Sequence, residues 1–308
     1  MEQREFIVDP ETAGQRIDRF LSGEDTGLSR SALQGLVAEG HVLCNGKAPA
    51  KSLKLKAGDT VLLEIPDAKP IEAVPQDIPL EIVYEDAHLL VVNKPKGMVV
   101  HPAPGNPDGT LVNALLWHCK GSLSGIGGEI RPGIVHRIDK DTSGLVLAAK
   151  NAYAAPLLAG RVTKLYYAIA QGALPLGKGA IDAPIGRRGD SIIGRCVTPE
   201  GKPSRTEYTI IKEENGLSLA ACVPVTGRTH QIRVHFSSIG HPLAGDAMYG
   251  ANPQLSEALG LERQWLHAMQ LEFRHPRTHV WTTVKSHYPA DLQHALDVMR
   301  ARHADQSL

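Results

Sequence analysis

A proline-rich segment divides this chain into two parts of unequal length. Pro66, Pro70, Pro75 and Pro79 lie close together, and prolines at this spacing favour an extended spacer. The whole chain has 308 residues, which is long for one compact unit. We therefore expect two domains joined by a linker. The predicted ranges are 12–66 for the first domain, 67–79 for the linker and 80–303 for the second domain.

The shorter part has the pattern of two helices followed by a small β-sheet. Apolar residues recur at helical spacing around Ile17 and again around Leu33, and Gly40 ends the second run. The pair Asn45-Gly46 follows between short strand-like runs, which is a strong signal for a hairpin. Residues 1–10 are interpreted as a short lead-in to this domain.

The longer part is predicted to be an α+β domain. Its C-terminal segment carries Leu292, Leu296 and Met299 on one helical face. A second helix is expected at 231–239, before Gly240. Strands are expected at residues 82–84, 89–92, 134–138, 145–149, 165–170 and 206–211.

The composition limits the classes of protein that remain. Hydrophobic residues make up 42% of the chain and charged residues 21%, as in ordinary soluble proteins. No run approaches the roughly 20 apolar residues of a membrane helix, and the opening Met1–Glu5 is acidic where a secretory signal is basic and then apolar. Formal net charge is zero, so RNA binding would depend on local basic patches. We expect a cytoplasmic protein without a membrane partner.

Cysteine and histidine spacing argues against a metal site. The 4 cysteines are scattered singly, without a Cys-x-x-Cys pair, so neither a zinc site nor a disulfide framework is expected. His230, His235 and His241 lack the i, i+4 spacing of a metal-binding helix. The sequence therefore predicts no metal and reduced cysteines.

The segment His136–Gly144 has the sharpest chemical pattern in the chain. Apolar runs at 134–138 and 145–149 flank it, and we interpret them as a pair of strands. Residues i and i+2 share one face of a strand, so Arg137 and Asp139 are predicted on the same side. A carboxylate at the end of a buried strand suits a catalytic acid or nucleophile. The alternative is a turn in which Asp139 only caps backbone amides.

Two later segments add candidate residues. Strand alternation places Lys164 and Tyr166 on one face, where Tyr166 is suited to stacking on a base; the alternative is half-buried packing. In Gly227–His235, Thr229 is a candidate cap for a helix that carries Arg233. A nearby arginine would keep a desolvated aspartate ionised. The alternative for this segment is a surface helix with solvated charges.

Taken together, these segments resemble the RluA family of pseudouridine synthases. His136–Gly144 is similar to the family's signature around its invariant aspartate, although Ile138 stands where the family usually has Leu. The resemblance implies that Asp139 is the essential carboxylate, that Tyr166 is the family's tyrosine and that Arg233 pairs with the aspartate. It also implies a mixed, mainly antiparallel sheet with flanking helices, no cofactor, and isomerisation of uridine to pseudouridine. Other similar segments are Asn93–Gly97, Val100–Pro102, Gly240–Asp246 and Leu266–Ala268.

Residues 15–65 resemble the RNA-binding module of ribosomal protein S4. Leu28–Ser31 and the turns Asn45-Gly46 and Gly58-Asp59 carry this likeness. It implies a small α+β RNA-binding domain, whose RNA face must be local because acidic residues slightly outnumber basic ones there. In the second domain, Arg137 is expected to fill the space that a flipped base leaves or to contact the RNA backbone. The residues expected on the RNA face of the module are Arg16, Arg30, Lys47, Lys51, Lys54 and Lys56.

The likeness is greatest to the branch of the family that modifies 23S ribosomal RNA. The segment Pro102–Leu115 contributes to this assignment. It implies that the partner is 23S rRNA or the large ribosomal subunit and that the target is the helix 69 hairpin. We expect the protein to act as a monomer. Two alternatives stay open: the same chemistry on another rRNA site or on tRNA, and a non-catalytic RNA-binding assembly factor.

Overall fold

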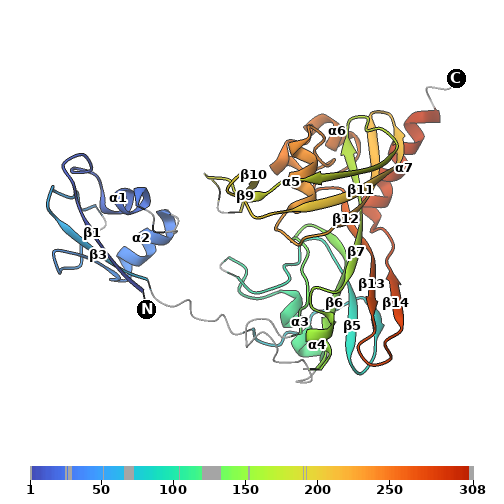
Figure 1. Ribbon diagram of the computed structural model, residues 1–308, viewed down its shortest axis with the longest axis horizontal. Coiled ribbons are helices and arrows are strands. Elements are labelled where there is room, and N and C mark those ends of the chain that lie inside the picture. Colours follow the sequence, from blue (N-terminus) through green and yellow to red (C-terminus); the bar gives the residue numbers. More distant parts are fainter. Residues whose placement is uncertain are drawn as a thin grey trace. The chain divides into compact units, whose positions relative to one another are not determined.

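The chain folds into two units, Met1–Pro70 and Ile71–Leu308 (Figure 1). The computed structural model describes residues 2–24, 26, 30–50, 52–65, 73–103, 105–119, 133–151, 153–189, 191 and 193–304. Each unit has a hydrophobic core of its own.

The first unit packs two short helices on a three-stranded antiparallel sheet. The strand order is β1-β3-β2, and Ile17, Leu21, Leu33 and Leu63 are fully buried between helices and sheet. Its elements are β1 (Glu2–Ile7), α1 (Ile17–Gly23), α2 (Arg30–Ala38), β2 (Val42–Cys44) and β3 (Thr60–Ile65).

Two details of this unit differ from the sequence-based expectation. The expected lead-in contains β1, which pairs with β3 along its length. The alternating pattern of β1 is too short to distinguish a strand from an unstructured tail. In the structure, Phe6 of this strand contacts Phe20 edge to face. The turn at Asn45-Gly46 is present, with both residues at positive φ, but β2 pairs with β3 and not with the lysine-rich stretch after the turn.

The second half of the expected linker is attached to the second unit. The Gln76 amide donates to the Asn113 carbonyl at 3.0 Å, and Asn113 Nδ2 donates to the Val74 carbonyl at 2.8 Å. Asn113 lies on helix α3 (Leu111–Cys119). The extended backbone that the prolines favour is therefore held against α3 by hydrogen bonds.

A mixed, mainly antiparallel sheet of nine strands forms the frame of the second unit, as far as the structure describes it. The order is β4-β5-β6-β13-β7-β12-β11-β8, and β14 pairs with β13. Only the contact of β13 with β6 is parallel, so the predicted α+β class with a mainly antiparallel sheet is confirmed. The strands are β4 (Ile82–Glu85), β5 (Leu89–Lys94), β6 (Ser143–Ala149), β7 (Thr163–Gln171), β8 (Gly177–Asp182), β11 (Arg205–Glu214), β12 (Leu217–Pro224), β13 (Leu266–Arg274) and β14 (Trp281–Lys285).

Helices and one small hairpin complete the second unit. Cores form on both faces of the sheet, one including Phe236 of α5 and another including Leu292 of α7. The remaining elements are α4 (Ala154–Leu158), α5 (Gln231–Ser238), the 3-10 helix η1 (Ala247–Tyr249), α6 (Pro253–Ala258), α7 (Ala290–Ala304), and the hairpin of β9 (Ile185–Arg187) with β10 (Arg195–Val197).

Strands β6, β13 and β7 lie side by side in the middle of the sheet. The parallel contact of β6 with β13 requires glycine at position 144, where φ is +114°. A Cβ atom there would lie 2.4 Å from the Ala268 carbonyl oxygen. The backbones of the two strands therefore meet directly behind the loop that carries Asp139.

The predicted strand at 134–138 is wrong. Only an isolated bridge from Ile134 to Ala148 forms there. The His136 side chain replaces part of the strand ladder, because its Nε2 accepts the Leu147 amide at 3.0 Å. Asp139 is consequently presented by a loop and not by the end of a strand, and the i, i+2 argument for Arg137 does not apply.

Candidate active site

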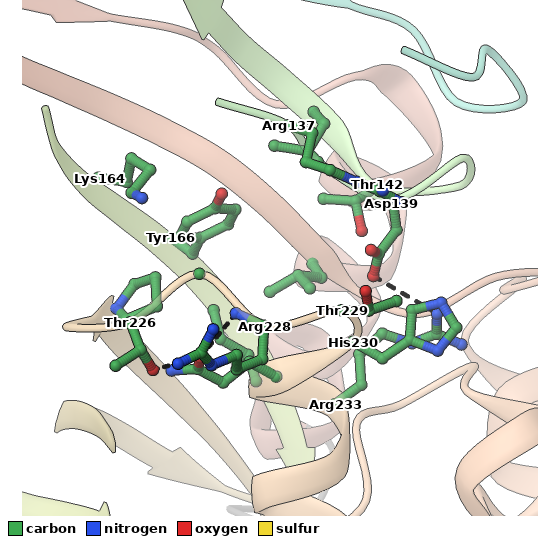
Figure 2. Close-up of a pocket in the computed structure, with 16 residues that line it drawn as sticks. Arg137, Asp139, Thr142, Lys164, Tyr166, Thr226, Arg228, Thr229, His230 and Arg233 are labelled. Carbon is green, nitrogen blue, oxygen red and sulfur yellow. Dashed lines mark hydrogen bonds and ion pairs between the residues drawn. The ribbon is translucent and has the colours of Figure 1, made fainter. Parts of the chain in front are cut away.

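Three distant segments bring their functional side chains to one cavity of about 70 Å³ (Figure 2). Asp139 comes from the loop before β6, Tyr166 from β7, and Arg233 from α5. Arg137 is exposed and also lines this cavity. The structure thus places together the second-unit residues that the sequence singled out.

The loop that carries Asp139 is held by hydrogen bonds to its backbone. The Thr142 amide donates to the Asp139 carbonyl at 3.2 Å. The side chain of Lys94 is fully buried, and its ammonium donates to the Lys140 carbonyl at 3.0 Å. It also donates to two backbone carbonyls within the four residues that follow it. Burial lowers the pKa of Lys94 to about 7, although the charges of Asp141 and Asp139 act in the opposite direction.

A buried arginine holds the same loop from the other side. Arg263 Nη1 donates to the Asp141 carbonyl at 2.8 Å, while its Nε lies 2.8 Å from Asp291 at the start of α7. Lys96 also pairs with Asp291, at 3.1 Å. Despite an opposing effect of burial, the hydrogen bond and charge of Arg263, followed by those of Lys96, lower the pKa of Asp291 to about 2. The position of the loop is therefore tied to the packing of α7.

Arg233 lies between two carboxylates. Its Nη1 is 3.5 Å from Asp139 Oδ2, which is the pairing that the sequence predicted. Its shorter contacts are to Asp246, with Nε at 2.7 Å and Nη2 at 2.8 Å from the two carboxylate oxygens. The guanidinium also lies over the Tyr249 ring, 4.9 Å from its centroid. Burial acts to lower the pKa of Arg233, but the two carboxylates outweigh it and raise the pKa.

Sequence reasoning assigned no role to Asp246. The segment Gly240–Asp246 was noted only as similar to the family, yet its single carboxylate follows an apolar run and is 1% exposed. A buried charge needs a partner, and this was the signal in the sequence that could have identified Asp246 as a partner of Arg233.

The expected cap of α5 by Thr229 is wrong. The residue before the helix is His230, at φ 58°, and its side chain makes no capping hydrogen bond.

Tyr166 provides an apolar wall with a polar end. The side chain is 7% exposed, and within the described residues its hydroxyl has no hydrogen-bond partner. Burial, and then the charge of Asp139, raise the pKa of Tyr166. Its phenol is consequently neutral at ordinary pH, with the ring available to a flat ligand.

The residues expected on the RNA face of the first unit are only partly described. Arg16, Lys47, Lys54 and Lys56 are exposed, and Arg16 pairs with Asp18 at 3.0 Å. Lys51 and the side chain of Arg30 lie outside the described residues. The roles of these residues in RNA binding stay predictions.

The cavity suits chemistry that relies on one carboxylate, a stacking ring and a supporting cation. Across the described ranges, no group of three or more His, Cys, Asp or Glu side chains is arranged to hold a metal ion. The same residues contain no helix that is both long and apolar enough to cross a membrane.

Comparison with known sequences identifies close relatives over nearly the whole chain. The family model for RNA pseudouridylate synthase matches residues 88–238. An uncharacterised RNA pseudouridine synthase of Bacillus subtilis is 42% identical, over 97% of this chain and 99% of that protein. The ribosomal large subunit pseudouridine synthase D of Zymomonas mobilis is 45% identical, over 95% and 96%. The protein of the same name from Pseudomonas aeruginosa is 40% identical, over 97% of each.

Solved structures agree with these sequence matches. Human RNA pseudouridylate synthase domain containing 4 superimposes with a TM-score of 0.55 at 25% identity, covering 71% of this chain and 93% of that one. Human RNA pseudouridylate synthase domain containing 1 gives a TM-score of 0.52 at 26% identity, covering 76% and 98%. The pseudouridine synthase fold expected for the second unit is thereby confirmed. The chain belongs to the RluA family of RNA pseudouridine synthases, enzymes that isomerise uridine within RNA.

Proposed function

We propose that this enzyme converts uridine to pseudouridine in 23S ribosomal RNA, within the helix 69 hairpin of the large subunit. The observation that carries the choice of RNA is the set of relatives named ribosomal large subunit pseudouridine synthase D, which are 38% to 45% identical over nearly their full lengths. The matched part includes both units of this chain, so the proposal covers the whole protein and not only its catalytic unit.

The proposed reaction begins with extrusion of the target uridine. A stacked base is out of reach of a carboxylate in a cavity, so the nucleotide must flip, at a cost of a few kcal/mol for unstacking. The exposed Arg137 at the edge of the cavity then fills the vacated space or contacts the phosphate backbone. The flipped base stacks on Tyr166, since RNA-binding proteins commonly hold extruded bases on aromatic rings.

Asp139 then acts on the sugar. It either attacks C1′ or removes a proton from C2′, and both routes break the N1–C1′ bond with the electron pair left on uracil. Uracil leaves as a resonance-stabilised anion, so a single carboxylate suffices where a glycosidase uses two to assist a poorer leaving group. Arg233, whose Nη1 lies 3.5 Å from Asp139 Oδ2, supplies the opposite charge that holds this carboxylate in place beside the sugar.

The first unit is proposed to add affinity for the RNA backbone. Its exposed Arg16, Lys47, Lys54 and Lys56 are suited to salt-dependent contacts with phosphates. Removal of residues 1–66 should therefore weaken binding of ribosomal RNA far more than it slows the bound reaction. Equal affinity of the shortened and the full-length protein would contradict this role.

The choice of RNA is tested with unmodified large subunits labelled with tritium at uridine C5. Isomerisation releases that tritium, and the modified positions are then mapped in the RNA. The proposal predicts release that maps to helix 69. Release that maps to another rRNA site, or that occurs only with tRNA, would keep the chemistry and refute the proposed target.

A further inference from the structure

Lys164 is a charged residue of the cavity that has no role in the steps proposed for Asp139 and Tyr166. It lies on β7 two residues before Tyr166, so both side chains are on the same face of the strand. Both line the cavity, and Figure 2 shows them next to each other with Asp139 on the opposite side. Its ammonium makes no hydrogen bond or ion pair to any residue that the structure describes.

The surroundings of Lys164 desolvate its charge without compensating for it. Burial lowers the pKa of Lys164, and no carboxylate acts to raise it. His136, which is close enough to sense the Lys164 charge, has its pKa lowered to about 3, first by burial and then by Lys164. Its Nε2 already accepts the Leu147 amide, so in the neutral ring the other nitrogen carries the proton. Among the residues that the structure describes, that nitrogen has no hydrogen-bond partner, and a donor cannot serve Lys164 as an acceptor.

The other charged side chains of the cavity do not act as an acceptor for the Lys164 ammonium. Asp139 faces Arg233 on the far side, while Arg137 and Arg228 are exposed cations at the edge. A half-buried ammonium without an acceptor is less stable than one in water. It becomes favourable when a ligand brings negative charge or a carbonyl oxygen to it.

The position of Lys164 matches the place where negative charge develops in the reaction. Side chains at i and i+2 of a strand are about 6–7 Å apart, so a base stacked on Tyr166 has its edge within reach of the Lys164 ammonium. Asp139, across the cavity, acts at the sugar. When the N1–C1′ bond breaks, the electron pair spreads over N1, O2 and O4 of uracil. A fixed cation beside those oxygens is worth most when the charge is fully formed.

We propose that Lys164 binds the detached uracil anion and holds it on Tyr166 while the base turns from N1 to C5. This inference rests on the roles proposed for Tyr166 and Asp139. Lys164 remains protonated throughout and donates hydrogen bonds to the uracil oxygens. The C5–C1′ bond then forms with an electron pair of the anion, while the bond from Asp139 to C1′ breaks on the first route or Asp139 returns its proton to C2′ on the second. The hydrogen on C5 is lost as a proton to solvent, and N1 takes up a proton from solvent. No oxidant or cofactor enters the sequence of bonds.

The test compares Lys164→Met and Lys164→Arg with Lys178→Met, in single turnovers on RNA that the wild type modifies. Lys178 is exposed on β8, outside this cavity, and serves as the matched control for loss of one positive charge. Loss of one charge-stabilising donor typically costs about 100-fold or more in rate. Lys164→Met should therefore lower kcat by about that factor with little change in KM, Lys164→Arg should recover part of the rate, and Lys178→Met should behave as wild type. A raised KM with unchanged kcat would instead mark a phosphate contact and overturn the proposal.

A second measurement separates this role from a structural one. Fluorine at C5 of uracil withdraws electrons and stabilises the anion, so the reaction of 5-fluorouridine should depend less on Lys164. Loss of the N-glycoside is followed by mass spectrometry of digested RNA for both nucleosides. A clearly smaller defect of Lys164→Met with 5-fluorouridine than with uridine supports the proposal, and an equal defect refutes it. Inactivity of the wild type on helix 69 bears only on the proposed target, because the test uses whichever RNA the wild type converts.

Discussion

Asp246 is predicted to be the main anchor of Arg233, and its removal should destabilise the catalytic unit. The two short contacts, 2.7 Å and 2.8 Å, join a carboxylate that is 1% exposed to an arginine that is 6% exposed. Removing one partner of such a buried pair costs about 3–5 kcal/mol, because the other charge stays buried without compensation. Asp246→Asn keeps the volume and one acceptor, and Arg233 retains its longer contact to Asp139. We therefore expect a loss of about 3 kcal/mol in the free energy of unfolding.

The measurement is urea unfolding followed by tryptophan fluorescence. All 3 tryptophans, Trp117, Trp265 and Trp281, belong to the second unit, so the signal reports on that unit alone. The matched control is Asp182→Asn, which breaks a pair with Arg205 whose side chains are 67% and 42% exposed. Exposed pairs contribute only about 0–1 kcal/mol. A loss in Asp246→Asn no larger than in Asp182→Asn would refute the reasoning that Asp246 anchors Arg233.

Three further outcomes follow from the structure. Gly144→Ala should cost more than about 2 kcal/mol of stability, because the new Cβ would lie 2.4 Å from the Ala268 carbonyl oxygen; Gly189→Ala, with open space at that position, is the control, and equal unfolding midpoints would contradict the prediction. Tyr166→Phe should retain base stacking, so full activity in single turnovers would exclude proton transfer by the hydroxyl, whereas a fall in kcat alone would support it. The folded-state pKa of Asp291, about 2, lies below its ordinary value of 3.8, so its contribution of about 2 kcal/mol is present above pH 3.8 and is lost as pH falls toward 2. Asp291→Asn should accordingly be destabilised by about 2 kcal/mol at pH 6 and by about half of that at pH 3, and a deficit of equal size at both values would contradict this assignment.

Local patterns predicted about half of the elements of the fold; strands β8, β12, β13 and β14 and helices α3, α4 and α6 were not predicted. Helix α5 follows from the spacing of Ile232 and Phe236, and the central strand β7 follows from the alternation around Tyr166. In both cases, the residues that produce the pattern are the ones that the core buries. The pattern and the tertiary structure therefore select the same conformation.

Elements that depend on one specific contact could not be predicted in this way. The apolar run before Asp139 has the composition of a strand, but the His136 side chain takes the Leu147 amide and the ladder does not form. Strand β1 is short, and its pairing with β3 joins residues that are far apart in the sequence. Neither outcome is visible in the local alternation of apolar and polar residues.

In the candidate site, too, residues in local sequence motifs were predicted and residues that act through tertiary contacts were not. Asp139, Tyr166 and Arg233 were found from the sequence and lie in one cavity. The side chains that hold them were not assigned, because Asp246, Lys94 and Arg263 act through contacts formed only by the folded chain. A loop carboxylate that neutralises an arginine on helix α5 has no signature at fixed sequence spacing.

The central claim is that Asp139 performs the chemistry at the sugar, and the most direct test is turnover by Asp139→Asn. Tritium release from uridine C5 and RNA binding are measured together for the wild type, for Asp139→Asn, and for the exposed Asp297→Asn on α7 as a control for loss of one carboxylate. We expect no detectable release by Asp139→Asn, unchanged RNA affinity, and wild-type behaviour of Asp297→Asn. Release by Asp139→Asn within tenfold of the wild-type rate would show that another group performs the reaction.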